Sequence, residues 1–167
     1  MEVEVSIRAI MMVPRTNAAV VMLREEGPGE REVPVWVGAL EVRSIGLQIE
    51  NFEPPRPFTH DLIRELLREM DARVTRIVIH DVRNNTFFAH IHLEHKRRKL
   101  AIDARPSDAI AVALRTRAPI FVHQRVLQRG ARTAGQELID DSEPPEDSEA
   151  LGDWLEGLAD EDLGDAQ

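Results

Sequence analysis

The feature of this sequence that most restricts its fold is a change of hydrophobic period that occurs twice. Residues 3–37 contain alternating or short continuous apolar stretches, which is the pattern of β-strands. After Gly38 the spacing becomes that of an amphipathic helix. Residues 74–103 return to strand patterns, and residues 106–117 again predict a helix. The sequence therefore predicts an α+β fold.

The two halves share this order of predicted elements. Ile45 and Ile49 occupy the positions that Ile110 and Leu114 occupy 65 residues later. We therefore predict internally duplicated strand-strand-strand-helix units that form a mostly antiparallel sheet system with packed helices. A further helix is expected between the halves, from Thr59 as N-cap to about Asp71. Its buried side is expected to contain Leu62, Ile63, Leu66, Leu67 and Met70.

The charge of the chain is divided unevenly between a body and a tail. The net charge is −9, but residues 1–130 carry 20 Lys and Arg against 17 Asp and Glu, whereas residues 131–167 carry 1 against 13. We predict a folded domain over residues 1–130, an acidic disordered linker over 131–150, a short amphipathic helix over 151–163 and a tail over 164–167. Trp154 is the expected anchor of that last helix.

Several classes of protein are excluded or disfavoured by what the sequence lacks. Cysteine is absent, which excludes disulfide scaffolds, thiol catalysis and thiolate metal sites. The charged, alternating N-terminus does not have the pattern of a signal peptide, and no apolar run approaches membrane-spanning length. We therefore expect a cytoplasmic location and no membrane partner. No Gly-rich phosphate loop is present, and no organic cofactor is expected.

The densest polar segment between two apolar elements runs from Asp103 to Asp108, where a strand leads into a helix. Backbone amides at a helix start attract anions, and Arg105 can clamp a phosphate. Asp103 and Asp108 can together hold a divalent cation, as paired carboxylates do in phosphodiester hydrolysis. The alternative is plain capping, with Ser107 as N-cap and Arg105 neutralising Asp103.

Two other helix starts carry candidate groups. His60 follows Arg56 and Thr59, and a histidine there can serve in acid–base chemistry, or it can be an exposed residue of a capped helix. Glu41 lies in the first turn after Gly38. If the halves are related, Glu41 and Asp108 lie at equivalent helix starts and can share one cleft; a plain surface carboxylate is the alternative.

A group of histidines forms a second candidate site. His90 and His92 share one face of their strand, and a three-residue hairpin loop would place His80 directly opposite His90. Three imidazoles can bind zinc or another transition metal. A two-residue loop would shift the pairing by one residue and break the group. The basic run at residues 96–99 can attract nucleic acid or can be a solvated turn.

Three segments together resemble the bifunctional nuclease domain family, a widespread bacterial family with plant relatives. They are residues 34–38, 55–62 and 103–111, and the resemblance extends over about residues 3–125. It implies a compact α+β domain, often self-associated, with nuclease activity toward DNA and RNA. The family's signature segments correspond to the region of Glu41, to Arg56, Thr59, His60 and Asp61, and to Asp103, Arg105, Ser107 and Asp108.

The sequence as a whole predicts a non-specific nuclease. Asp103 and Asp108, with Glu41 as a further carboxylate, would hold Mg²⁺ or Mn²⁺; His60 would act as general acid or as a hydrogen-bond donor to phosphate. Phosphate and substrate contacts are assigned to Arg105, Arg56, Ser107 and Thr59. The alternative is a non-catalytic oligomeric module that binds a small anionic ligand or a protein partner. The expected partners are DNA, RNA and further copies of the chain, with the acidic tail restraining nucleic-acid binding.

Overall fold

Seven strands and three eleven-residue helices make up most of the described part of the chain, which consists of residues 1–13, 18–27, 31–84 and 86–129 of this computed structural model. The elements are β1 (Glu2–Val13), β2 (Ala18–Glu25), β3 (Glu32–Gly38), α1 (Ala39–Ile49), α2 (Thr59–Glu69), β4 (Ala72–Arg83), β5 (Thr86–His95), β6 (Arg98–Ala104), α3 (Pro106–Thr116) and β7 (Ile120–His123). A short helix at 124–129 follows β7. The linker, terminal helix and tail predicted for residues 131–167 lie outside the described residues.

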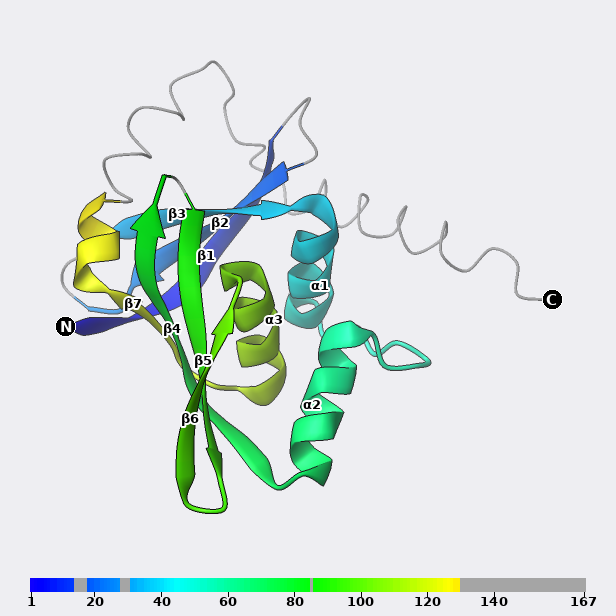
Figure 1. Ribbon diagram of the computed structural model, residues 1–167. Coiled ribbons are helices and arrows are strands. Elements are labelled where there is room, and N and C mark those ends of the chain that lie inside the picture. The colour runs from blue at the N-terminus through cyan, green and yellow to red at the C-terminus, as the bar shows by residue number, and fades with distance from the viewer. Residues whose placement is uncertain (14–17, 28–30, 85, 130–167) are drawn as a thin grey trace.

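All seven strands belong to one sheet with the order β3-β2-β1-β7-β4-β5-β6 (Figure 1). Strands β1–β3 form one antiparallel meander and β4–β6 form another. Strand β7 joins them, because it pairs antiparallel with β1 and parallel with β4. The predicted α+β class and the mostly antiparallel sheet are therefore confirmed.

The internal duplication stays a prediction, because a shared order of elements does not by itself show one. Helices α1 and α3 have equal length, and their first residues, Ala39 and Pro106, are 67 positions apart rather than the 65 expected. Glu41 and Asp108 each occupy the third position of their helix. The additional helix α2 lies between the two units.

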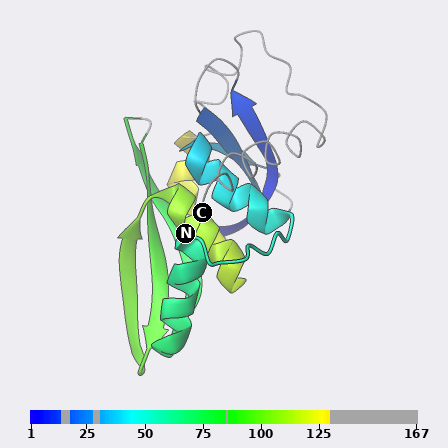
Figure 2. The same ribbon diagram turned by 90° about the vertical axis from the view of Figure 1, so that its right-hand side faces the viewer.

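The three long helices pack on one face of the sheet (Figures 1 and 2). Helix α1 contacts β2 and β3, whereas α3 contacts β4 and β5 and also packs against both other helices. Fully buried side chains such as Leu23, Ile45, Ile77 and Ile110 fill the space between them. Burying each such aliphatic side chain contributes about 1.5–3 kcal/mol to the stability of the fold. This packing holds the three helices, and with them their first residues, in place on the sheet. No helix in the described part of the chain is both long and apolar enough to cross a membrane.

Helix α2 covers the sheet less completely than its composition suggested. Of the five apolar residues expected on its buried side, Ile63 and Leu67 pack against the core, whereas Leu62, Leu66 and Met70 are 52%, 54% and 59% exposed. The prediction for these three was wrong because α2 packs mainly on α3 and β4, so only a narrow stripe of it is covered.

The helix starts also differ in detail from those expected. Thr59 is the first helical residue of α2, and the carboxylate of Asp61 accepts a hydrogen bond from the backbone N–H of Phe58, the residue before the helix, at 3.0 Å. In α3 the N-cap is Arg105 rather than Ser107, because Pro106 occupies the first helical position, for which its fixed φ is suited. Ser107 is the second helical residue and is buried.

The hairpin between β4 and β5 has a two-residue loop, but a β-bulge in β4 keeps His80 next to His90. Arg83 pairs with Thr86, so the loop has two residues, the case expected to separate the histidines. A register shift between Ile79 and Asp81 inserts His80 as an extra residue. Val78 therefore lies opposite His90, yet the rings of His80 and His90 stack with centroids 4.0 Å apart. The bulge thus restores a contact that regular pairing would have lost.

Candidate active site

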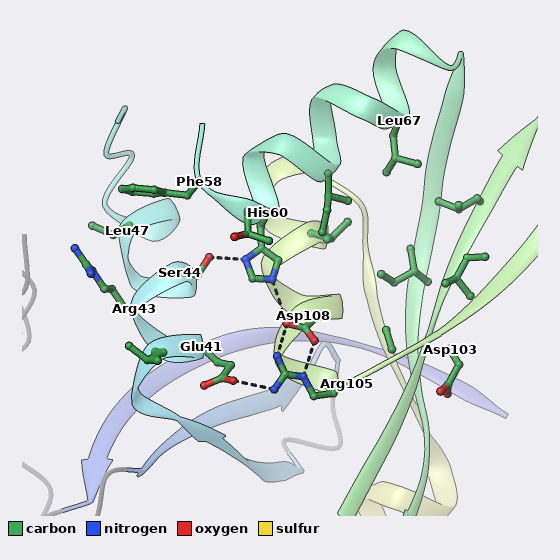
Figure 3. Close-up of a pocket in the computed structure, with 18 residues that line it drawn as sticks. Glu41, Arg43, Ser44, Leu47, Phe58, His60, Leu67, Asp103, Arg105 and Asp108 are labelled. Atoms are coloured by element: carbon green, nitrogen blue, oxygen red, sulfur yellow. Dashed lines mark hydrogen bonds and ion pairs between the residues drawn. The ribbon is translucent and has the colours of Figure 1, made fainter. Parts of the chain in front are cut away.

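A pocket of about 810 Å³ lies where the three helices meet strands β5 and β6. Much of its lining is apolar, and this part includes Leu47, Ile63, Leu67, Ile91, Leu93 and Val112. Its polar side includes Glu41 and Ser44 from α1, His60 from α2, and Arg105 and Asp108 at the start of α3 (Figure 3). The helix packing described above therefore brings together groups that lie up to 67 positions apart in the chain.

Arg105 is held between the two carboxylates at the starts of α1 and α3. Its Nε and Nη2 donate to Asp108 at 2.7 and 3.0 Å, and its Nη1 donates to Oε1 of Glu41 at 2.8 Å. These contacts, with Asp108 the stronger partner, raise the pKa of the Arg105 guanidinium above its ordinary value. Three of its five N–H groups are used, which leaves two for a ligand on a side chain that is 64% exposed. Glu41 and Asp108, which the sequence places in one cleft only if the two halves are related, both line this pocket.

His60 lies between a hydroxyl and a carboxylate. Its Nδ1 is 2.8 Å from Ser44 Oγ, and its Nε2 is 3.2 Å from Asp108 Oδ1 (Figure 3). Burial alone would raise the pKa of Asp108, but the hydrogen bonds and charges of Arg105 and His60 outweigh it and hold that pKa below its usual range. An ionised carboxylate only accepts hydrogen bonds, so the Nε2 of His60 carries the proton. In the neutral ring Nδ1 then accepts from the Ser44 hydroxyl.

A buried ion pair below the pocket fixes this array. The Nε of Arg115 donates to Asp61 Oδ1 at 2.6 Å, and the two side chains are only 2% and 10% exposed. The Nη1 of Arg115 also donates to the backbone carbonyl of Ser44 at 3.0 Å. One guanidinium therefore connects α3 to the residue after His60 and to Ser44 itself. Asp61 follows His60 in sequence, but the imidazole forms its hydrogen bonds with Ser44 and Asp108. Asp61 therefore has a positioning role, through its ion pair with Arg115.

The remaining predicted site residues are spread over different surroundings. Thr59 lines the pocket, whereas Arg56 is exposed in the connector before α2 and Ser107 is buried in α3, neither of them in the lining. Asp103 contributes to the lining, but it lies apart from the Arg105–Asp108 ion pair (Figure 3). Its carboxylate belongs to a different group, with His80 and His90.

Sequence reasoning missed two residues of this site. Ser44 lies on a helical position where a serine carries no distinguishing signal. Arg115 lies in the last turn of α3, where a basic residue is expected simply from the helix dipole. The predicted basic run at residues 96–99 is exposed and outside the pocket lining; residues 96 and 97 form the turn between β5 and β6, and residues 98 and 99 begin β6.

Comparison with known sequences connects this geometry to a family. The sequence profile described as "Bifunctional nuclease domain" matches residues 21–134, which contain every polar group of the pocket. This chain belongs to the bifunctional nuclease domain family. The resemblance seen in residues 34–38, 55–62 and 103–111 is thereby confirmed.

Relatives of this domain occur in bacteria and plants. An uncharacterized protein of Mycobacterium tuberculosis is 37% identical over 140 residues, which cover 84% of this chain and 80% of the relative. The rice protein named "Bifunctional nuclease 1" is 27% identical over 113 residues, and the Arabidopsis thaliana protein named "Bifunctional nuclease 2" is 28% identical over 129 residues. The aligned region covers 33% and 37% of these two plant proteins, so they contain long regions that have no counterpart in the alignment.

Proposed function

We propose that this domain is a nuclease that hydrolyses phosphodiester bonds of DNA and RNA with little sequence specificity. Membership of the bifunctional nuclease domain family and the names of the plant relatives support the reaction class. The observation that carries the proposal is the array at the pocket, in which His60 contacts Ser44 and Asp108 while Arg105 lies directly beside them.

Each step of phosphodiester hydrolysis has a suitable group in this array. The two remaining N–H groups of Arg105 can bind the non-bridging phosphate oxygens and neutralise the charge that develops on them. The Nδ1 of His60 can accept the proton of the attacking hydroxyl, which is either water or Ser44 Oγ, and the resulting imidazolium is stabilised by Asp108. As the nucleophile bonds to phosphorus, the P–O bond to the leaving oxygen breaks and the imidazolium protonates that oxygen. Where Ser44 is the nucleophile, water then hydrolyses the phosphoseryl ester, with His60 taking the proton of the water and returning it to Ser44 Oγ.

The apolar part of the pocket supports contact with a nucleobase. Phe58 lines the pocket and is 43% exposed, so one aromatic ring is available for stacking. Stacking tolerates any base, because every base has a π-face. The proposed specificity is therefore for the phosphodiester rather than for a base sequence.

The Mg²⁺ or Mn²⁺ ion expected at Asp103 and Asp108 stays a prediction, and the proposed reaction is written without it. Both oxygens of Asp108 already accept hydrogen bonds from Arg105 or His60. Asp103 belongs to a separate group of side chains. A cation shared by the two carboxylates would require both of these arrangements to change.

The test is cleavage of labelled single- and double-stranded DNA and RNA by purified wild type and variants, in EDTA, Mg²⁺ and Mn²⁺. His60→Ala should lower the rate by about 10²–10⁴-fold, the usual contribution of a positioned acid–base group. The matched control is His123→Ala, because His123 ends β7 and is absent from the pocket lining. Asp108→Asn should also lower the rate. Ser44→Ala distinguishes the two possible nucleophiles, because it should abolish cleavage if Ser44 Oγ attacks the phosphorus and should retain cleavage if water does. Equal cleavage by wild type and His60→Ala would refute the proposal.

A second function, a self-associating module, is supported by the outer face of α2. Leu62, Leu66 and Met70 are spaced by four residues and are more than half exposed. Such a stripe is typical of a helix that packs against another helix. If a second copy covers it, Leu66→Glu should lower the concentration-dependent mass measured by light scattering. A mass that falls only in Trp154→Ala would instead assign the contact to the predicted terminal helix.

A further inference from the structure

We propose that His80, His90 and Asp103 form a binding site for a Zn²⁺-type transition metal on the face of the sheet that the helices leave uncovered. The three residues come from the adjacent strands β4, β5 and β6. One potential ligand atom from each lies within 4.8 Å of the other two. This is the only such group of three metal-binding side chains in residues 1–13, 18–27, 31–84 and 86–129.

The sheet register places the two histidines of this group away from the pocket, whereas Asp103, in the edge strand β6, also contributes to the pocket lining. His90 pairs directly with Asp103 across β5 and β6, so their side chains project from the same face. The neighbours of His90 in β5, Ala89 and Ile91, point the other way and pack with the core beneath the helices. The imidazole of His90 is therefore separated from the array of His60, Arg105 and Asp108 by the thickness of the sheet.

The bulge in β4 brings the third side chain to this face. It inserts His80 between Ile79 and Asp81 and allows the ring to stack on that of His90 with a 22° angle between the planes. The guanidinium of Arg125 donates to the His80 carbonyl at 2.9 and 3.0 Å, which holds the bulged backbone in place. Bulges commonly redirect one side chain at functional sites, and here the redirected side chain completes a group of three.

An unsatisfied ring nitrogen also points to a ligand at this position. The Nε2 atom of His80 is buried and has no hydrogen-bond partner among the described residues. A buried polar atom without a partner is costly, and a metal ion or its bound water would satisfy it. Asp103 is exposed, so its carboxylate can rotate toward the imidazoles without disturbing the core.

The kind of donor selects the kind of metal. Two imidazole nitrogens and one carboxylate oxygen suit Zn²⁺, Co²⁺ or a similar ion, whereas Mg²⁺ prefers oxygen ligands alone. Metal–ligand bonds of about 2.0–2.2 Å in a tetrahedron place ligand atoms about 3.4 Å apart, so the three groups must approach one another by up to about 1.4 Å. The fourth position faces away from the core and would hold water.

The experiment is a titration of the full chain, freed of metal with EDTA, with Zn²⁺ by calorimetry and with Co²⁺ by visible absorption. Wild type should bind one Zn²⁺ per chain and give the intense absorption of four-coordinate Co²⁺. Asp103→Asn and His90→Ala should each weaken binding by about 100-fold or more, because each removes one of three ligands. Asp103→Asn is the main variant, since its exposed side chain is not needed for folding, and circular dichroism verifies the fold of both.

Two controls identify the site. His92→Ala removes a neighbouring histidine on the same strand face, and Asp108→Asn removes the carboxylate predicted from the sequence to share a cation with Asp103. Both should bind Zn²⁺ within threefold of wild type, whereas a shared Asp103–Asp108 site would lose affinity in Asp108→Asn. Wild type that binds no stoichiometric Zn²⁺, or Asp103→Asn that binds as tightly as wild type, would overturn the proposal. These binding measurements are independent of whether the domain cleaves nucleic acid.

Discussion

The Asp61–Arg115 ion pair gives a direct test of how the candidate active site is held together. Replacing Asp61 with Asn preserves the size of the side chain but leaves the guanidinium of Arg115, which is only 2% exposed, without a counter-charge. Breaking a buried pair in this way costs about 3–5 kcal/mol. The individual contacts give a similar figure, because Asp61 accepts hydrogen bonds from Arg115 and from the Phe58 backbone, and bonds to charged groups contribute about 1.5–3 kcal/mol each.

The assay is urea and thermal unfolding followed by circular dichroism. For a domain of this size, a loss of 3–5 kcal/mol corresponds to a fall of about 10–20 °C in the unfolding midpoint. Glu69→Gln is the matched control, because Glu69 is on the same helix in an exposed ion pair with Arg68 at 3.2 Å. An exposed pair contributes at most about 1 kcal/mol.

The double variant Asp61→Leu/Arg115→Met separates the buried charge from the loss of contacts. It removes both charges, so it should be more stable than Asp61→Asn even though the Ser44 carbonyl loses a donor. Glu69→Gln should have a free energy of unfolding within about 1 kcal/mol of that of wild type. If Asp61→Asn does as well, then the ion pair does not support the site in the way that its burial indicates.

Three further predictions concern charge and packing. Folding lowers the pKa of Asp108, so the ionised carboxylate contributes to the free energy of unfolding above the unfolded pKa of 3.8, and this contribution is lost as the pH falls through the lower folded pKa. Below pH 4, the free energy of unfolding should therefore decrease less steeply with falling pH in Asp108→Asn than in wild type. Ile45→Ala should cost about 2–5 kcal/mol in urea unfolding because Ile45 is fully buried, whereas Leu62→Ala, at a side chain 52% exposed, should cost less than about 1 kcal/mol. Deletion of residues 131–167, which carry 13 acidic residues, should strengthen nucleic-acid binding at low salt, with the difference shrinking as salt rises; equal affinities at low salt would contradict this.

Local patterns predicted the elements of this domain well, because alternation and helical spacing are properties of neighbouring residues. The meander of each half and all three long helices follow from such patterns. Glu41 and Asp108 each lie at the start of a helix that follows three strands, but they meet because α1 packs on α3, which the local patterns did not require. What the patterns could not provide was the depth at which α2 packs, and hence the exposure of Leu66 and Met70.

The positions of two polar side chains, Asp103 and His80, could not be predicted from local patterns, for a common physical reason. The position of Asp103 depends on strand alternation, which turns its side chain away from that of Ala104 and toward His90 in the neighbouring strand. The position of His80 depends on a bulge, which no alternating pattern reveals. The pairing between strands therefore determines the group that Asp103 and His80 form with His90. The short distance in sequence between Asp103 and Arg105 does not predict it.

The charge balance at the pocket indicates how the proposed nuclease would select a phosphodiester without attracting anions strongly from a distance. The starts of α1 and α3 each contribute about half a positive charge, and Arg105 contributes one more. Glu41 and Asp108 together offset this total, so the array is close to neutral. A bound phosphate must therefore be recognised at short range, by the two remaining N–H groups of Arg105, and it competes with the carboxylates for them. Long-range attraction is left to the excess of basic over acidic residues in residues 1–130, which the acidic residues 131–167 oppose.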